Sequence, residues 1–401
     1  MRVLVILNSL ELGGTQINAV DFAWRLRERG IESILIGPRD TAGDGLSLFD
    51  YAGTRGIGIE AFASADGMAA QARQLRRIAD EHGVDLVHVC GMWGSARPTY
   101  WGPAIFGRRP WVQTVYEMSV TPVVHRHMPL IVGTEYLIEE LAHRPGRTVL
   151  ISPPVDLESD APDSDAGRRF RAEHRLGDGP QLGIVSRLDS RMKATAIATA
   201  IDAMRPLSAL GATLYVVGGG DAEETLRARA DAVNRELAYD AVRMLGPLSD
   251  PRPAYAAADI MLGMGGSAAR SLAFGRPLIV HGEAGWSCLF EECTAAMLAR
   301  SSFWSPDRPL HPVEDLVRIA EPVIGDPAWR VALGAFGRRF AEERFGLDAM
   351  SERLAAFYEE AVGTYRAGEW LRDLPREGRR VGGMLRRRLG LVPRAVTGSR
   401  T

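Results

Sequence analysis

The chain has 401 residues, enough for about two domains at roughly 150 to 200 residues each. Its formal net charge is −2, so no overall basic field indicates a nucleic-acid partner. It contains three cysteines and no C-x-x-C pair, which argues against a disulfide framework or a structural zinc site and fits a reducing cytoplasm. We therefore expect a two-domain cytoplasmic protein.

The first part of the chain alternates short apolar runs with amphipathic stretches. The opening sequence MRVLVILN has too short an apolar run for a signal peptide and predicts a buried strand. No later stretch reaches about 18 apolar residues, so no transmembrane helix is expected. Further strands are predicted at 32–37, 85–90, 111–116, 129–134 and 148–154, with helices at 16–30 and 68–83. Apolar strands with helical connections predict a parallel sheet that is covered on both faces.

The alternation stops at 156–167, an acidic segment with Pro and Gly, and then begins again. Strands are predicted at 181–187, 212–220, 241–246, 258–264 and 277–282, and a helix at 329–362 closes the second unit. Two α/β units joined by a linker predict two doubly wound, Rossmann-like domains that face a cleft. We place the first domain at 1–155, the linker region at 156–175, the second domain at 176–345, and closing helices with an Arg-rich tail at 346–401.

The tail differs in composition from the rest of the chain. Residues 363–401 hold ten Arg against three acidic residues. The segment GRRVGGMLRRRLGLV could form a basic amphipathic helix for an anionic membrane surface, although two glycines weaken the helix. The alternatives are a solvated tail and a helix that packs back on the first domain.

Two glycine-containing loops follow predicted strands, where open α/β sheets bind ligands. Gly13 and Gly14 follow the first strand, and their amides can approach a phosphate because no Cβ intervenes. A tight turn is the alternative there. Gly265 and Gly266 precede a helix with Ser267 as its predicted N-cap. The free amides of that helix would present a partial positive charge to the cleft, which suits an anion.

A single lysine stands at a third strand end. The sequence contains 48 Lys and Arg residues, and Lys193 is the one Lys among them, six residues after Arg187. An Arg can bind two phosphate oxygens as a fork, and an ammonium can follow the charge that develops on a leaving group. The alternative is a surface salt bridge, but solvated cations in this chain are otherwise Arg. We therefore expect Arg187 and Lys193 to bind a diphosphate.

Several segments occur in a fixed order: LNSLELGGTQ, DLVHVCGMW, VSRLDSRMK, VRMLGPLSDPRPAYAAADIMLGM, SLAFGRPLIV and RRFAEERFGLDAMSERLAAFYEEA. This ordered set, across residues 1–362, resembles the retaining GT-B glycosyltransferases, specifically glycosyltransferase family 4. The resemblance implies transfer of a sugar from a nucleotide-diphosphate donor in the second domain to an acceptor in the first, in glycan or natural-product biosynthesis. It implies no cofactor and no divalent metal. Arg187, Lys193, the Gly14 amide and the helix start at Gly266 and Ser267 would stabilise the leaving diphosphate.

The chain departs from the family where the sugar should be held. The second His of the H-x-H pattern is Cys90, and the paired glutamates correspond to Leu262 and Arg270. Neither Leu nor Arg can accept a hydrogen bond from a sugar hydroxyl. The family's P-H-G segment reads Val115, Tyr116 and Glu117 here. The sequence thus retains the residues for phosphate but not those for the sugar.

Other polar residues are candidates to replace them. Glu117 and Glu283 both follow strands that should point into the cleft, and we add them to Arg187 and Lys193 as catalytic candidates. Arg270 stays a donor-site candidate by its position, and the nucleotide base is expected near Met244 and Leu245. The acceptor candidates are Cys90, Trp93, Tyr116, His125 and His127. Core packing is the alternative for Trp93, and no matching ligand makes His125 and His127 a zinc site.

Two other functions fit the same features. The loss of the glutamates also suits a protein that binds a nucleotide sugar without transferring it. A GT-B-fold sugar-nucleotide epimerase would interconvert donors without an acceptor, but the closing helices and the VSRLDSRMK segment favour the transferase.

Overall fold

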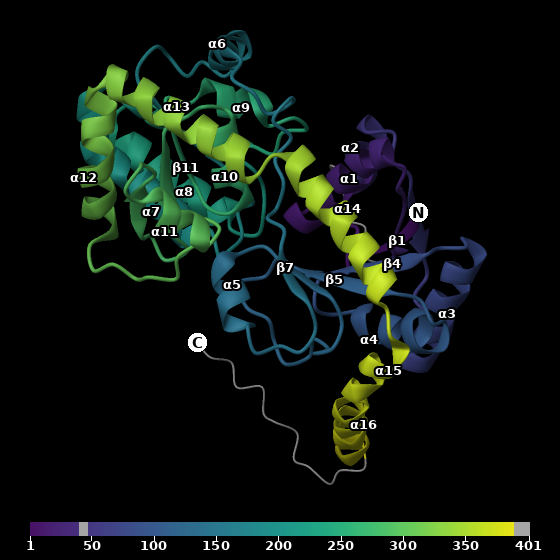
Figure 1. The fold of residues 1–401 in the computed structure, drawn as a ribbon. Helices are drawn as coiled ribbons and strands as arrows, with labels where there is room; N and C mark the ends of the chain where they lie inside the picture. The colour runs from purple at the N-terminus through teal and green to yellow at the C-terminus, as the bar shows by residue number, and fades with distance from the viewer. Residues whose placement is uncertain (40–46, 389–401) are drawn as a thin grey trace.

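The computed structural model describes residues 1–39 and 47–388, which form two α/β domains (Figure 1). The first domain has a seven-stranded sheet in the order β3-β2-β1-β4-β5-β6-β7, with all neighbours parallel. Its strands are β1 Arg2–Leu7, β2 Glu32–Pro38, β3 Ile59–Phe62, β4 Leu86–Cys90, β5 Trp111–Val115, β6 Leu130–Val132 and β7 Thr148–Leu150. The prediction of a buried parallel sheet in this half is confirmed.

Helices cover both faces of this sheet because successive strand residues point to opposite sides. From β1, Val3 and Val5 pack toward the cluster that contains α1 (Gly14–Leu26) and α14 (Leu347–Thr364). Leu4 and Ile6 pack toward the cluster with α3 (Met68–Glu81), α4 (Ala96–Thr99) and the π-helix Tyr100–Phe106. The apolar run in the first strand is thus buried from both sides.

The second domain repeats the arrangement with a six-stranded sheet in the order β10-β9-β8-β11-β12-β13. Its strands are β8 Gln181–Val185, β9 Thr213–Val217, β10 Val242–Gly246, β11 Ile260–Gly263, β12 Leu278–His281 and the antiparallel edge strand β13 Ser287–Leu289. One face is covered by α7 Ala194–Leu207, α8 Glu223–Leu237 and α12 Pro312–Gly325, and the other by α9 Arg252–Ala257, α10 Gly266–Ala273 and α13 Pro327–Arg344. The predicted pair of doubly wound domains is confirmed.

The segment predicted as a linker contains a helix. Within 156–175, α6 (Ser164–Glu173) begins at Asp163, whose side chain accepts a hydrogen bond from the Ala166 amide at 2.8 Å. Phe170 packs in the same apolar cluster as α9 and α10. An N-cap and one apolar face are enough to fold these residues onto the second domain, although their overall composition is acidic.

The helix predicted at 329–362 is two helices, and they belong to different domains. It breaks at Phe345 and Gly346, where the chain runs beside Val155. The Val155 amide donates to the Phe345 carbonyl at 2.8 Å, and the Leu347 amide donates to the Val155 carbonyl at 2.9 Å. From there α14 crosses to the first domain, where it lies against α1 (Figure 1). The two connections between the domains are therefore hydrogen-bonded to each other.

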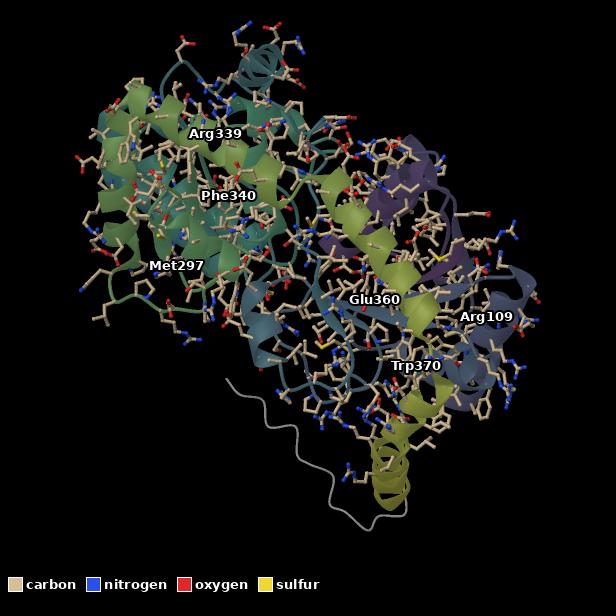
Figure 2. The ribbon with its side chains drawn as sticks, in the orientation of Figure 1. Arg109, Met297, Arg339, Phe340, Glu360 and Trp370 are labelled. Atoms are coloured by element: carbon tan, nitrogen blue, oxygen red, sulfur yellow. The ribbon has the colours of Figure 1, made fainter. Side chains whose placement is uncertain are left out.

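The following helices also pack on the first domain. Trp370, labelled in Figure 2, ends α15 (Ala367–Trp370). Its ring is buried edge-on against Trp111, and its carbonyl accepts a hydrogen bond from the Tyr100 hydroxyl at 2.8 Å. A further helix, α16 (Leu374–Arg388), follows. Residues 389–401 of the predicted membrane-binding tail lie outside the described residues. Among the residues described, no helix is long and apolar enough to cross a membrane.

Candidate functional site

The candidate site lies at the carboxyl ends of β8, β11 and β12. A cavity of about 20 Å³ lies there, with room for roughly one water-sized group. Its polar lining comes from Lys193, Ser186, Ser267 and His281. The remaining lining residues are Ile184, Ala196, Ile197, Leu262, Gly263 and Met264. Because the lining mixes one cation with three neutral polar groups, the cavity suits an oxygen-rich or anionic group.

The loop after β8 is folded by Asp189, and this fixes Lys193. The Asp189 carboxylate accepts hydrogen bonds from the amides of Arg191 and Met192, both at 2.9 Å. The Asp189 carbonyl then accepts from the Lys193 amide at 3.0 Å, and α7 begins one residue later. The Asp of the VSRLDSRMK segment therefore serves as a turn residue that places the lysine at the start of a helix.

Arg187 and Lys193 form a pair of cations without a carboxylate partner. Lys193 is half-buried and Arg187 is exposed, and neither forms an ion pair with any described residue. Burial, and secondly the charge of Arg187, lower the pKa of Lys193 to about 8, while Asp189 and Glu283 oppose the shift. The charges of Arg187 and Glu283 therefore both act on Lys193, in opposite directions. Two adjacent cations that repel each other are stabilised by an anion that lies between them.

The glycine loop at the start of α10 leaves the helix end open. Gly265 has a φ of +59°, which favours glycine, and a side chain at Gly265 or Gly266 would meet no atom within 4 Å. Ser267 is not the N-cap that the sequence predicts. Ser267 is instead the second residue of the helix. Its hydroxyl donates to the Val185 carbonyl at 2.7 Å and accepts from the Tyr255 hydroxyl at 3.2 Å. The first residue of α10, Gly266, is exposed, and the second, Ser267, lines the cavity.

Glu283 follows β12, and residues of the segment after β13 hold its side chain and its amide. Its carboxylate accepts a hydrogen bond from the Trp304 indole at 3.2 Å, and its amide donates to the Ser305 carbonyl at 3.1 Å. The side chain is half-buried. A carboxylate positioned in this way can accept a hydrogen bond from a sugar hydroxyl, which Leu262 cannot do.

Other donor-site candidates are placed differently. Arg270 binds Asp160, with Nε and Oδ2 2.7 Å apart, and Asp160 is almost fully buried. The donor-binding role expected of Arg270 is therefore not supported, because its guanidinium joins α10 to the segment after Val155. Met244 and Leu245 lie in β10 at a register irregularity and pack against the two apolar clusters of the domain. Both are half-buried at the edge of the sheet.

The start of α1 is open in the same way as the start of α10. Gly13 is the N-cap residue, and Gly14 is the first residue of the helix. A side chain at Gly14 would meet no atom within 4 Å. The amide of Gly14 therefore remains accessible to a ligand.

The acceptor candidates of β4 and β5 do not form one surface. Cys90 is buried in the core beside α1 and α14, and burial, with a smaller effect of Glu117, raises its pKa to about 12. Tyr116 lines an enclosed cavity with Cys90 and His88 under α1. Glu117 and Trp93 are exposed, with 57% of Trp93 accessible. Only the last two are available to an acceptor, and Trp93 is not the core residue of the alternative interpretation.

His125 and His127 contact the helices that follow α14. Nε2 of His125 lies 3.3 Å from a Glu377 oxygen, and its ring stacks on Tyr100. Nδ1 of His127 lies 3.2 Å from Asp373, whose carboxylate also accepts from the His127 amide at 3.0 Å. The structure therefore does not bring these histidines to the acceptor face. It shows instead that the described part of the tail packs back on the first domain.

One site residue was not singled out from the sequence. His281 ends β12 and lines the cavity with Lys193, yet in the segment IVHGEAGW only Glu283 was selected. A signal was present, because a histidine directly follows four apolar or proline residues at a strand end. No cluster of three His, Cys, Asp or Glu suited to a metal ion occurs among residues 1–39 and 47–388.

Sequence comparison matches the second domain to a known family. Residues 179–301 match the family described as "Glycosyl transferases group 1". A GDP-mannose-dependent alpha-(1-6)-phosphatidylinositol monomannoside mannosyltransferase from Mycobacterium tuberculosis is 30% identical over 225 residues, which cover 52% of this chain and 54% of the relative. The chain spans about half the length of the curated relatives it matches.

Structure comparison extends over both domains. A glycosyltransferase from Rickettsia africae is similar with a TM-score of 0.72 and 14% identity, covering 91% of this chain and 99% of that one. The Anabaena protein HepE in complex with UDP and glucose gives a TM-score of 0.71 at 19% identity, covering 90% and 99%. The chain therefore has the GT-B fold, and its second domain is similar to the group 1 glycosyl transferases.

Proposed function

We propose that this protein transfers a sugar from a nucleotide-diphosphate donor to an acceptor. The observation that carries the proposal is the unpaired Arg187 and Lys193 beside the open start of α10. Two cations and free helix amides are positioned before any substrate arrives. Such preorganised donors stabilise negative charge as it develops on a leaving diphosphate.

The roles of the groups follow from their chemistry. When the bond between the sugar and the diphosphate breaks, the electron pair moves to the phosphate oxygen, and charge grows where Lys193 and the α10 amides lie. The lysine ammonium, with its pKa near 8, is largely charged at neutral pH and follows that oxygen as a point charge. Arg187 holds the diphosphate as a fork, and Glu283 accepts a hydrogen bond from a sugar hydroxyl.

The finer features of the reaction belong to the same proposal. We propose retention at the anomeric carbon, because the VSRLDSRMK segment resembles that of retaining enzymes. We propose that no divalent metal takes part, because Arg187 and Lys193 already supply two positive charges to the diphosphate. The acceptor binds across the cleft at the first domain, where Trp93 and Glu117 are exposed.

The names of similar proteins suggest two classes of nucleotide-sugar donor, and an experiment can decide between them. The Mycobacterium relative is named for GDP-mannose, and HepE structures contain UDP and UDP-glucose. A thermal-shift screen with GDP-mannose, UDP-glucose, and ADP- and dTDP-sugars should show one base class that raises the melting midpoint, because a ligand that binds only the folded state stabilises it.

Lys193→Met then tests the chemistry. We expect at least about a hundredfold loss of turnover, the size seen when one preorganised donor is removed from an active site. Lys193→Arg keeps the charge and is the matched control for folding and electrostatics. Normal turnover by the methionine variant would contradict the site assignment.

A non-catalytic nucleotide-sugar binder is a second candidate, favoured by one observation. Leu262, where the family resemblance places a glutamate, is a buried apolar residue in the cavity wall. Donor titration followed by a turnover assay over a broad acceptor set separates the two functions. Tight donor binding without turnover would support the binder.

A further inference from the structure

His281 is a buried histidine whose ring lacks a partner. Its side chain is 2% exposed, and Nε2 has no hydrogen-bond partner among the described residues. Ser287 is paired with His281 across the β12–β13 ladder, so the two side chains share a face, and the Ser287 hydroxyl is also buried without a partner. Buried polar groups in folded proteins are nearly always hydrogen-bonded, so these two need an explanation.

The contrast with His88 shows that the chain can satisfy a buried histidine. His88 lies in β4 of the first sheet, and its two ring nitrogens lie 2.6 Å from the Tyr358 hydroxyl and 2.7 Å from the Thr114 hydroxyl. Both rings are fully buried in sheets of the same design. His88 also lines a cavity, but both of its ring nitrogens have hydrogen-bond partners, whereas Nε2 of His281 has none among the described residues.

The ring of His281 is neutral at physiological pH. Burial lowers its pKa to about 4, and no carboxylate forms an ion pair with it within the described residues. A neutral imidazole has one N–H donor and one acceptor nitrogen. It can therefore donate a hydrogen bond without adding a third full charge next to Lys193 and Arg187.

The cavity shared by His281 and Lys193 suits a single oxygen atom. It has room for roughly one water-sized group, and its remaining lining is largely apolar, including Leu262 and Ile197. The lysine ammonium gives the cavity a positive potential, and the start of α10 adds partial positive charge. A negatively charged oxygen is therefore favoured over a neutral hydroxyl.

We infer that His281 is a donor-binding residue whose Nε2–H donates a hydrogen bond to an oxygen of the nucleoside diphosphate held by Lys193. This inference rests on the proposed function, because it needs the diphosphate at Lys193. His281 would thus supply a neutral hydrogen-bond donor at the end of β12, in addition to the cations Arg187 and Lys193 that follow β8. His281 and Glu283 then contact different parts of one donor, the diphosphate and the sugar.

The test compares diphosphate affinities of matched variants by calorimetry. The nucleoside diphosphate of the base class found in the thermal-shift screen is titrated into wild type, His281→Leu and His281→Gln. Leucine removes both ring nitrogens at similar volume, and glutamine keeps an N–H donor. We expect His281→Leu to bind about tenfold or more weakly, the usual effect of losing a hydrogen bond to a charged oxygen, and His281→Gln to retain most of the affinity.

Ile279→Leu is the matched control, because it changes a buried apolar residue of the same strand that does not line the cavity. Its affinity for the diphosphate should stay within about threefold of wild type, since volume-conserving apolar replacements are tolerated. Melting midpoints of all variants establish that each is folded. In addition, the ring nitrogen resonances of His281 in ¹⁵N-labelled wild type should shift when the diphosphate binds, a readout that needs no substitution.

The outcomes distinguish a failure of the proposed function from a failure of the His281 inference alone. Wild type that binds none of the nucleoside diphosphates would overturn the proposed function and this inference with it. Diphosphate binding that is equal in wild type and His281→Leu, with no shift of the ring resonances, would overturn the inference alone. A loss seen only with the intact nucleotide sugar, and not with the diphosphate, would also contradict it, because the ring would then contact the sugar.

Discussion

The corresponding edges of the two domains differ in how their polar side chains are satisfied. In the second domain, Lys193 and His281 border one cavity, and Nε2 of His281 has no hydrogen-bond partner among the described residues. In the first domain, His125 and His127 face carboxylates of the helices after α14. Both edges are rich in polar residues, but only one of them leaves those residues available to a ligand.

The difference teaches that residue type alone does not locate a binding site in this fold. Glu377 contacts Arg97, Arg380 and the Trp101 indole as well as His125, and its side chain is 1% exposed. That cluster is a buried ionic network, and His125 lies 3.3 Å from its carboxylate without a hydrogen bond. Arg97 and Trp101 lie 280 and 276 positions before Glu377, so residues of the first domain bind a helix far along the chain.

The largest expected effect comes from breaking the network of the first domain. Glu377→Ala leaves Arg97 and His125 without their carboxylate, and removing one member of a buried ionic group typically costs about 3 to 5 kcal/mol. The free energy of unfolding from urea titration measures this loss. Glu360→Ala, an exposed replacement on α14, is the control and should change it little. Unchanged stability would show that the network is not structural.

Arg270→Met tests whether the Arg270 side chain stabilises the fold or binds the donor. The variant leaves Asp160 buried without its partner, and we expect a loss of about 2 to 3 kcal/mol in the free energy of unfolding. Donor affinity should stay within about twofold, because the guanidinium points to Asp160. Arg339→Met, at an exposed position in α13, is the comparison variant. A selective loss of donor affinity would return Arg270 to the binding site.

Donor affinity should depend on pH through Lys193. Its pKa of about 8 lies below the usual value for lysine, so the ammonium is lost as pH rises through 8. Affinity for the nucleotide sugar should be constant from pH 6 to about 7.5 and then fall by up to about tenfold per pH unit. Calorimetry over that range measures it, and Lys193→Arg should remove the dependence.

The same lowered pKa has a consequence for the ligand-free protein. Between about pH 8 and 10.4 the unfolded chain holds the Lys193 proton and the folded protein does not, so stability rises with pH in this window. Relative to Lys193→Met, the wild-type melting midpoint should therefore increase across it. A difference between the two melting midpoints that does not change with pH would show that the pKa of Lys193 is not lowered.

The smallest expected effect is that of His127→Ala. The ring is partly exposed, and Asp373 keeps its hydrogen bonds from the amides of Arg126 and His127. We expect a loss of about 1 kcal/mol, the typical net value of one polar contact, with no change in acceptor KM. A large rise in KM at unchanged stability would restore the acceptor role.

Much of the fold could be predicted from the sequence, because the spacing of apolar residues and the order of the predicted elements indicate it. Apolar strand runs separated by amphipathic helices indicate parallel sheets without reference to distant contacts. Lys193 stood out because it is the single lysine in an Arg-rich chain. These features are local or compositional, and the structure confirms the elements that they predict.

The rest depended on contacts that sequence periodicity does not encode. The apolar stripe of α14 predicts that one face is buried, but not that the partner is α1 of the other domain. The same holds for Glu377 and His125, which look like surface residues until the helices pack. His281 was overlooked because a buried strand residue is identified as core, and only the cavity shows that its ring is unpartnered.

The crossing of the chain at Val155 and Gly346 bears on the order of events during synthesis. The core of the first domain includes Leu354, Phe357 and Tyr358 of α14, which leave the ribosome after every strand of the second domain. Domains usually fold as they emerge, the N-terminal one first. Here the second domain can complete its core while the first still exposes the surface of α1 and β1. The domain that is translated first is therefore the last to be finished.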